Sequence, residues 1–111
     1  MKDDKLYLIH ISECIERIES YTREGREVFQ QSRMTQDAVT RNFEVIGEAV
    51  KHISPQFREA HPEITWRKWA AFRDVLIHAY FKIDFDEVWR VIAEDMPVVK
   101  RQLQELLSAL P

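Results

Sequence analysis

The apolar residues of the chain recur at spacings of three and four in several long stretches, which is the period of an α-helix. The first stretch covers residues 4–23, and Gly25 follows it. The second has its apolar positions between residues 39 and 53, and it ends at Ser54-Pro55 because proline cannot continue a helix. The pattern therefore predicts two long amphipathic helices in the first half of the chain.

The second half of the chain predicts two more main helices and one short one. Pro55 can open a short helical turn capped by Ser54, and a third main helix is expected from about Thr65 to Tyr80. Asp84 and Glu87 have the spacing of a capping pair at the start of a fourth helix. Pro97 lies inside its apolar pattern, so we expect a kink or break there.

Composition agrees with helices. The 111 residues include only two glycines and four prolines, too few for the turns of an all-β domain of this size. No repeat or linker separates the chain into parts. The sequence thus predicts an all-α fold, a four-to-five-helix, mostly antiparallel bundle that forms a single domain over residues 1–111.

Charge and cysteine content exclude several classes of protein. The net charge of −3 argues against a protein that coats nucleic acid by bulk electrostatics. A single cysteine, Cys14, permits no internal disulfide and no four-cysteine zinc site. The charged start of the chain does not resemble a secretory signal, and no stretch approaches the ~20 apolar residues of a membrane span. We expect a cytoplasmic protein with no membrane association.

The second predicted helix carries a polar face beside its apolar stripe. Arg41, Glu44 and Glu48 share this face through their helical spacing. They form either a salt-bridged surface exposed to solvent or one wall of a cleft or dimer face. Gly47 keeps the second interpretation open, because glycine within a helix costs about 1 kcal/mol and often marks the close approach of another backbone.

Aromatic residues gather around the third predicted helix, where eight of the chain's twelve lie between residues 57 and 89. Most are expected in the core. A surplus of Trp and Phe is also typical of a homodimer interface or of a groove for a partner.

The segment from Arg73 to Tyr80 places a guanidinium, a carboxylate, an imidazole and a phenol within eight residues. These groups are Arg73, Asp74, His78 and Tyr80. Taken alone, a helical Arg or His is more often a packing or capping residue than a catalyst. Arg73 and His78 are about 140° apart around a helix at ~100° per residue, so they do not stack as an i, i+4 pair does. They can still converge in a groove that a second copy of the helix completes across a two-fold axis.

Several segments together resemble one known family. They are residues 35–49, Ser54-Pro55, His61-Pro62-Glu63-Ile64 with Trp66, and above all the Arg-x4-His-x-Tyr pattern of Arg73, His78 and Tyr80. Through these segments the chain resembles the HepT-like toxins, a branch of the HEPN superfamily of small helical domains. The resemblance covers nearly the whole chain and is weakest at residues 24–34.

The resemblance implies a homodimer in which two Arg-x4-His motifs face each other and cleave RNA without a metal and without a cofactor. Arg73 and His78 then become the catalytic pair, and Asp74 a supporting polar residue. His78 acts as general base or acid, and Arg73 stabilises the negative charge that develops on the phosphate. Two departures stand out, because position 74 is Asp where many relatives have Asn, and Ala79 replaces a commoner Gly.

The resemblance also implies a partner, a minimal nucleotidyltransferase antitoxin that transfers AMP from ATP to the motif tyrosine, here Tyr80. The leading hypothesis is therefore a ribonuclease toxin of a toxin–antitoxin pair. The alternative is a non-catalytic helical adaptor that binds a nucleotidyltransferase through its aromatic surface. A third interpretation, a small-ligand or nucleotide-binding bundle, predicts saturable ATP binding by this chain alone.

Overall fold

The computed structural model describes residues 2–79 and 81–111 of the chain, and Met1 and Tyr80 lie outside the described residues. The described elements are all helical. In chain order they are α1 (Lys2–Tyr21), α2 (Arg26–Gln31), α3 (Arg33–His52), α4 (Pro55–Ala60), α5 (Trp66–His78), α6 (Phe85–Arg90), the π-helical turn η1 (Val91–Asp95) and α7 (Met96–Ala109).

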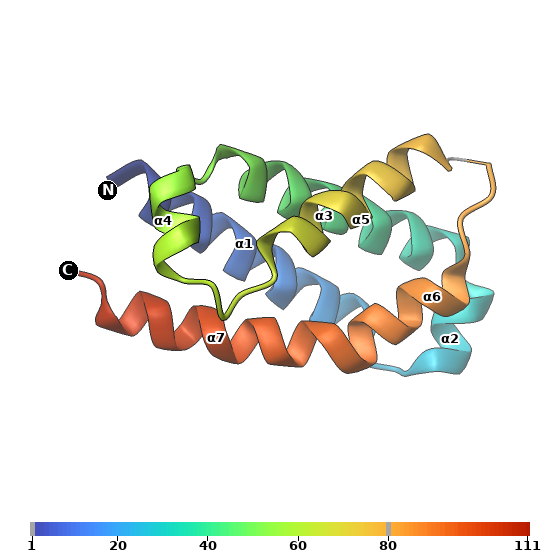
Figure 1. The fold of residues 1–111 in the computed structure, drawn as a ribbon. Coiled ribbons are helices and arrows are strands. Elements are labelled where there is room, and N and C mark those ends of the chain that lie inside the picture. Colours follow the sequence, from blue (N-terminus) through green and yellow to red (C-terminus); the bar gives the residue numbers. More distant parts are fainter. Residues whose placement is uncertain (1, 80) are drawn as a thin grey trace.

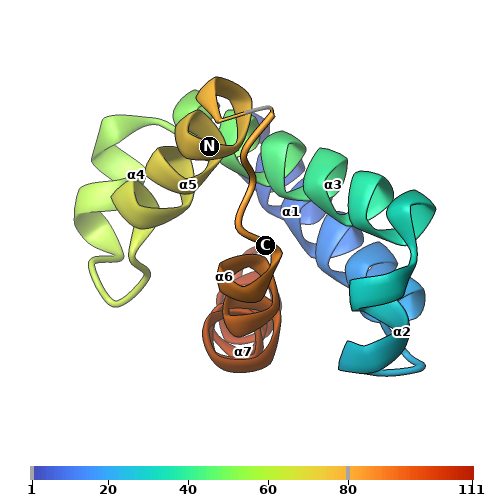
Figure 2. The ribbon, with the colours of Figure 1, turned by 90° about the vertical axis from the view of Figure 1, so that its right-hand side faces the viewer.

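The long helices α1, α3, α5 and α7 run alternately in opposite directions, and both ends of the chain lie at the same end of the molecule (Figure 1). Helix α3 packs against α1 on one side and α5 on the other. Helices α6 and α7 form the third side of the bundle, as the end-on view shows (Figure 2), and α7 contacts α1. The predicted all-α, mostly antiparallel bundle is confirmed.

One apolar core fills the space between these helices. The largest side chains with almost no exposure are apolar and come from α1, α2, α3, α6 and α7 and from Ile53 directly after α3. Helix α5 contributes Trp69 and Leu76 to the core, and Phe72 packs partly buried against it. Burial of each large apolar side chain stabilises the fold by about 1.5–3 kcal/mol, so these helices are held together mainly by the core.

Side chains that were expected as helix caps do cap helices. The Ser54 hydroxyl accepts a hydrogen bond from the Phe57 amide at the start of α4, and Asp84 accepts from the amides of Asp86 and Glu87 at the start of α6. The buried carboxylate of Asp4 also accepts hydrogen bonds from the Ser54 amide and hydroxyl, at 2.8 and 2.7 Å. This last contact ties the start of α1 to the end of α3.

The structure differs from the sequence prediction in two places. Residues 26–31 form the short helix α2 in a segment for which no helix was expected, and its Phe29 is fully buried. At Pro97, where a kink or break was expected, the helical run from α6 to α7 continues; it widens in the turn η1 just before Pro97, which lies in the first turn of α7. Proline lacks an amide hydrogen, and the first turn of a helix does not need one.

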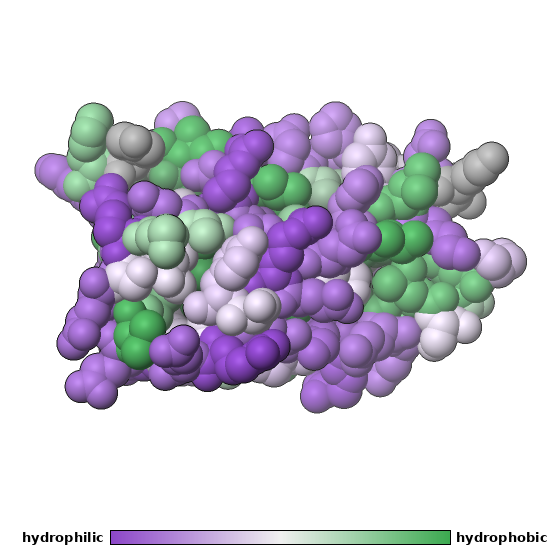
Figure 3. All heavy atoms as spheres, turned by 180° about the vertical axis from the view of Figure 1, so that it is seen from behind, coloured by the Kyte–Doolittle hydropathy of each residue, from purple (hydrophilic) through white to green (hydrophobic). Residues whose placement is uncertain are grey.

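The outer surface is mixed in character. On the face opposite to that of Figure 1, hydrophobic side chains form separate patches with hydrophilic side chains between them (Figure 3). Within the part of the chain that the structure describes, no helix combines the length and the apolar character needed to cross a bilayer.

Candidate active site

Helices α3 and α5 pack closely together at Gly47. A Cβ atom at this position would collide with Cβ of Arg73 and would lie 2.9 Å from the backbone oxygen of Trp69. Only glycine, which has no Cβ, allows the two helices to pack this tightly. The close approach that Gly47 indicated thus comes from α5 of the same chain, and it fixes the base of the Arg73 side chain against α3.

Arg73 is held by two carboxylates, one from each helix. Its Nη2 atom lies 3.0 Å from Oε2 of Glu48 on α3, and its Nη1 atom donates a hydrogen bond of 3.0 Å to Oδ1 of Asp74. Asp74 also accepts a hydrogen bond of 2.8 Å from Nζ of Lys51. Hydrogen bonds from Lys51 and then from Arg73 hold the pKa of Asp74 below its ordinary value, so this carboxyl group is ionised near neutral pH.

The guanidinium of Arg73 borders an open hollow of about 370 Å³ between α1, α3 and α5. The polar face predicted on the second helix lines the same hollow, since Arg41, Glu44 and Glu48 all border it. Arg41 is largely exposed, and its Nη1 atom lies 3.8 Å from Oε1 of Glu44. The full lining consists of Tyr7, His10, Arg41, Glu44, Val45, Glu48, Ala49, His52, Arg73 and Ile77.

Three ring side chains of this hollow were missed by the sequence analysis. They are Tyr7 and His10 on α1 and His52 at the end of α3. The rings of Tyr7 and His52 are stacked, with centroids 5.3 Å apart and planes 17° apart. Nε2 of His52 lies 3.2 Å from Oε1 of Glu48, four residues earlier. Only that Glu48–His52 spacing could have been recognised in the sequence, because the contact with Tyr7 arises from packing between helices.

His78 occupies a different position from Arg73. It is the last residue of α5, its side chain is exposed, and it is not among the described residues that line the hollow. Ala79 ends the helix as its C-cap. Tyr80, the expected acceptor of AMP, lies outside the described residues. Among the described residues of one chain, Arg73 therefore lines this hollow and His78 does not.

Comparison with known proteins identifies the family. A family model described as "Ribonuclease HepT-like" matches residues 11–106, which is most of the chain. The chain belongs to the HepT-like ribonuclease family. The predicted resemblance is thereby confirmed.

Individual relatives of this HepT-like chain carry ribonuclease names. It is 46% identical over 106 residues to a protein of Thermococcus cleftensis named "Probable ribonuclease HepT", and the match covers 95% of this chain and 96% of the relative. It is 43% identical over 110 residues to a protein of Methanocaldococcus jannaschii named "Gamma-glutamylcyclotransferase and putative RNase", covering 98% of this chain. The chain spans half the length of that second relative. No solved structure matches the chain significantly.

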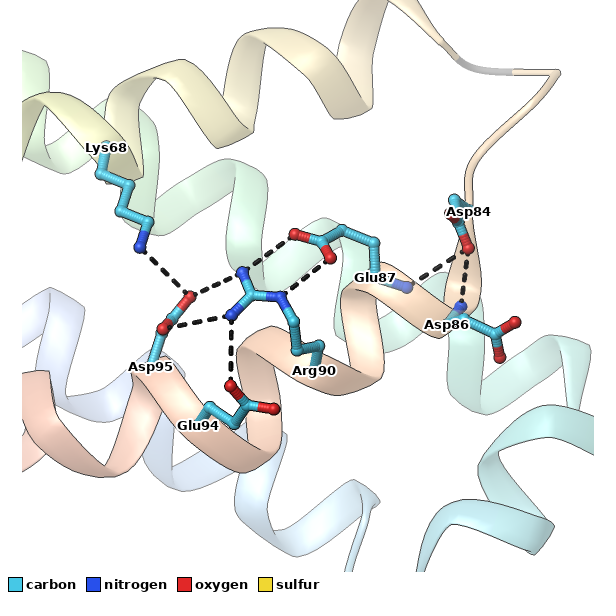
Figure 4. Close-up of polar contacts among 7 residues, drawn as sticks. All are labelled: Lys68, Asp84, Asp86, Glu87, Arg90, Glu94 and Asp95. Atoms are coloured by element: carbon cyan, nitrogen blue, oxygen red, sulfur yellow. Dashed lines mark hydrogen bonds and ion pairs between the residues drawn. The ribbon is translucent and has the colours of Figure 1, made fainter.

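A second arginine of this HepT-like chain is also surrounded by carboxylates. Arg90 on α6 lies 2.9 Å from Glu87, 3.6 Å from Glu94 and 3.0 Å from Asp95 (Figure 4). The hydrogen bonds that Arg90 donates to Glu87 and Asp95 raise the pKa of Arg90, and the bonds to Glu87 lower the pKa of that carboxyl group. All three carboxylates come from the same stretch of chain as Arg90 itself. Lys68 on α5 joins the cluster at 3.7 Å from Asp95.

Over 2–79 and 81–111, no three or more His, Cys, Asp or Glu side chains are arranged to hold a metal ion.

Proposed function

We propose that this HepT-like chain is a metal-independent endoribonuclease that acts as a homodimer, with Arg73 and His78 as its catalytic residues. One observation carries the proposal. In a chain whose relatives are named as ribonucleases, the guanidinium of Arg73 is held at the wall of an open hollow, with its side chain only 25% exposed. An arginine positioned in this way presents donors to a phosphate without having to be ordered first.

The proposed chemistry uses the ribose 2′-hydroxyl as nucleophile. Its oxygen bonds to phosphorus while the bond from phosphorus to the 5′-oxygen of the next nucleotide breaks. His78 removes the proton from the 2′-hydroxyl or supplies a proton to the leaving 5′-oxygen. Arg73 stabilises the extra negative charge on the phosphate oxygens in the transition state. The products are a 2′,3′-cyclic phosphate and a 5′-hydroxyl end.

The carboxylates beside Arg73 do not prevent this role. The partners Glu48 and Asp74 are each almost half exposed. Ion pairs of such exposure contribute only about 0–1 kcal/mol, so a phosphate can replace one of the carboxylates. The two carboxylates then position the guanidinium in the free protein, and phosphate takes over one side of it when RNA binds.

The separate positions of the two motif residues support the proposed homodimer. Arg73 borders the hollow, whereas His78 projects from the exposed end of α5. A second copy that packs near this end brings its own His78 and Arg73 into a shared groove. The same helix exposes Val75 and Ile77, with 59% and 38% of their surfaces accessible, which are apolar side chains suited to such a contact.

The proposed biological role is that of a toxin neutralised by a nucleotidyltransferase antitoxin. In this proposal the antitoxin transfers AMP from ATP to the phenol of Tyr80 and releases pyrophosphate. Tyr80 is two residues beyond His78, so an attached AMP would add bulk and a negative phosphodiester next to the groove. That group would exclude RNA and would compete for Arg73.

Cleavage of a defined RNA in the presence of EDTA tests the catalytic proposal. We expect cleavage by the wild-type protein to persist in EDTA, with cyclic phosphate ends identified by mass spectrometry, and to be lost in Arg73→Ala and His78→Ala variants. Folded, dimeric protein that neither cleaves RNA nor arrests growth contradicts the proposal and supports the non-catalytic adaptor.

Mixing the two inactive variants tests the shared groove. A dimer formed from one Arg73→Ala chain and one His78→Ala chain retains one guanidinium and one imidazole, on different copies. We expect the mixture to recover part of the wild-type activity after exchange of subunits. No recovery, with mixed dimers demonstrated by differently tagged chains, contradicts a site built from both copies.

Co-expression with the antitoxin tests the proposed modification. We expect the mass of the peptide that contains Tyr80 to increase by one or more AMP units, and a Tyr80→Phe variant to remain unmodified. An unmodified Tyr80 in a fully inhibited complex overturns this part of the proposal.

A further inference from the structure

Two chemically different groups line the hollow beside Arg73. Arg73 itself is a guanidinium, whereas Tyr7 and His52 form a pair of stacked rings. Glu48 connects the two groups, because its Oε2 atom lies 3.0 Å from Arg73 and its Oε1 atom 3.2 Å from His52. A guanidinium that can donate hydrogen bonds to a phosphate and a ring on which a base can stack therefore border the same hollow, and both contact the carboxylate of Glu48.

We propose that this hollow is a nucleobase subsite, in which a base next to the cleaved phosphate stacks on His52 while Arg73 binds that phosphate. The inference rests on the proposed ribonuclease function and extends it to the way in which the RNA strand is held. The ligand is a single-stranded nucleotide, with its base in the hollow and its phosphate at the motif arginine.

The exposure of the ring pair supports this assignment. Tyr7 packs partly buried against the core, whereas the side chain of His52 is 54% exposed. One face of the His52 ring is covered by Tyr7, with the planes only 17° apart, so a base on the outer side would extend an existing stack. Single-stranded nucleic acids are commonly held by stacking of this kind, because every base has a π-face.

The size and charge of the hollow also favour one base over a chain of phosphates. Its volume of about 370 Å³ lies within the range of sites for small ligands. The two arginines that line it are each matched by a carboxylate, Arg41 by Glu44 and Arg73 by Glu48. The lining therefore has little excess positive charge, and it suits an uncharged ring beside one phosphate.

The chain contains a matched control for the ring pair. His61 contacts the ring of Phe57 at 4.5 Å between centroids and lies 3.6 Å from a carboxylate oxygen of Glu63. This histidine thus has an aromatic neighbour and a glutamate partner, as His52 does, but it does not line the hollow. A change at His61 therefore tests for general effects of removing a histidine ring.

The experiment compares His52→Ala, His52→Phe and His61→Ala in steady-state cleavage of a short single-stranded RNA. We expect His52→Ala to raise KM by roughly 5- to 150-fold, the range found when a stacking side chain is removed, with little change in kcat. His52→Phe keeps a flat ring and is expected to restore most of the affinity, and His61→Ala to keep the KM of the wild type. Equal KM values for His52→Ala and His61→Ala overturn the subsite.

Binding of an oligonucleotide that lacks the 2′-hydroxyl nucleophile, and so cannot be cleaved, separates this inference from the function on which it rests. The same oligonucleotide with 2′-deoxyribose at every position is titrated against each variant, with fluorescence anisotropy as the readout. Weaker binding by His52→Ala than by His61→Ala supports the subsite, even if the wild-type protein proves not to cleave RNA. Cleavage by the wild type combined with unchanged binding by His52→Ala leaves the ribonuclease proposal standing and rules out the subsite.

Discussion

Two arginines of this chain, Arg73 and Arg90, are each surrounded by carboxylates, yet their surroundings differ in origin. The carboxylates around Arg90 all come from neighbouring residues of the same helical stretch, where they join the wide turn before α7 to α6 (Figure 4). Arg73 instead meets Glu48 from another helix and borders an open hollow that the stacked rings of Tyr7 and His52 also line.

The comparison shows that a cluster of ion pairs does not by itself indicate a site. The cluster around Arg90 borders a hollow too, between α5 and α6, but its three carboxylates outnumber the cations Arg90 and Lys68 and would repel a phosphate. At Arg73 the carboxylates are balanced by cations, because Lys51 shares Asp74. A phosphate can therefore approach Arg73 more easily than Arg90.

The largest expected difference between the two arginines is in catalysis. We expect Arg73→Ala to lower kcat for RNA cleavage by about 10²–10³-fold, the usual loss when a group that stabilises transition-state charge is removed. Arg90→Ala should leave kcat unchanged and produce only a small decrease in Tm. Single-turnover cleavage and thermal unfolding of both variants provide the test. A comparable loss of kcat in both would show that the arginines are not functionally distinct.

The fold could be predicted from the sequence to a large extent because its signals are local. The apolar period along each helix, the caps at Ser54 and Asp84 and the helical irregularity near Pro97 all depend on residues close together in the chain. Helix α2 was missed, since its six residues are too few to display a period and it is fixed by burial of Phe29 against its neighbours.

The candidate site could be predicted only in part, for the opposite reason. The polar face of α3 and the Arg-x4-His motif are local patterns, and they drew attention to two of the three helices that border the hollow. The rings of Tyr7, His10 and His52 reach the hollow from α1 and from the far end of α3. No spacing along the sequence reveals a contact between side chains on separate helices. The contribution of these three rings to the hollow could therefore be recognised only from the packing of the helices.

The next effect concerns the close contact between α3 and α5 at Gly47, beside Arg73. An alanine at Gly47 would gain about 1 kcal/mol of helix propensity but would force α3 and α5 apart, and overpacking of this kind costs about 1–3 kcal/mol. We expect Gly47→Ala to lower the free energy of unfolding by up to about 2 kcal/mol and to reduce cleavage through displacement of Arg73. Urea denaturation measures the first effect.

The exposed residue Ala71 on α5 provides the control for the effect of helix propensity on stability. Ala71→Gly removes about 1 kcal/mol of helix propensity without changing the contact at Gly47. A Gly47→Ala variant that is more stable than the wild type would mean that the helices accommodate the methyl group and that the glycine has no role in placing Arg73.

The smallest expected effect compares Asp74 beside Arg73 with Glu87 beside Arg90. The pKa of each carboxyl group is held below its ordinary value, mainly by hydrogen bonds from Lys51 and from Arg90 respectively. A group with a lowered pKa in the folded state stabilises the protein above its unfolded pKa, and this contribution is lost as the pH falls through the lower, folded value. Both carboxylates therefore make the protein less stable on acidification.

Neutral variants of these two residues separate stability from function. Asp74→Asn and Glu87→Gln should each make the decrease in Tm between pH 7 and about pH 3 shallower, since each removes one carboxyl group that takes up a proton in this range.

Only Asp74→Asn should also lower the KM for RNA, because it removes a negative charge that competes with phosphate for Arg73. Its KM should depend more steeply on salt than that of Glu87→Gln. If both variants shift KM equally, the charge at Asp74 acts through the overall field of the protein and not through its contact with Arg73.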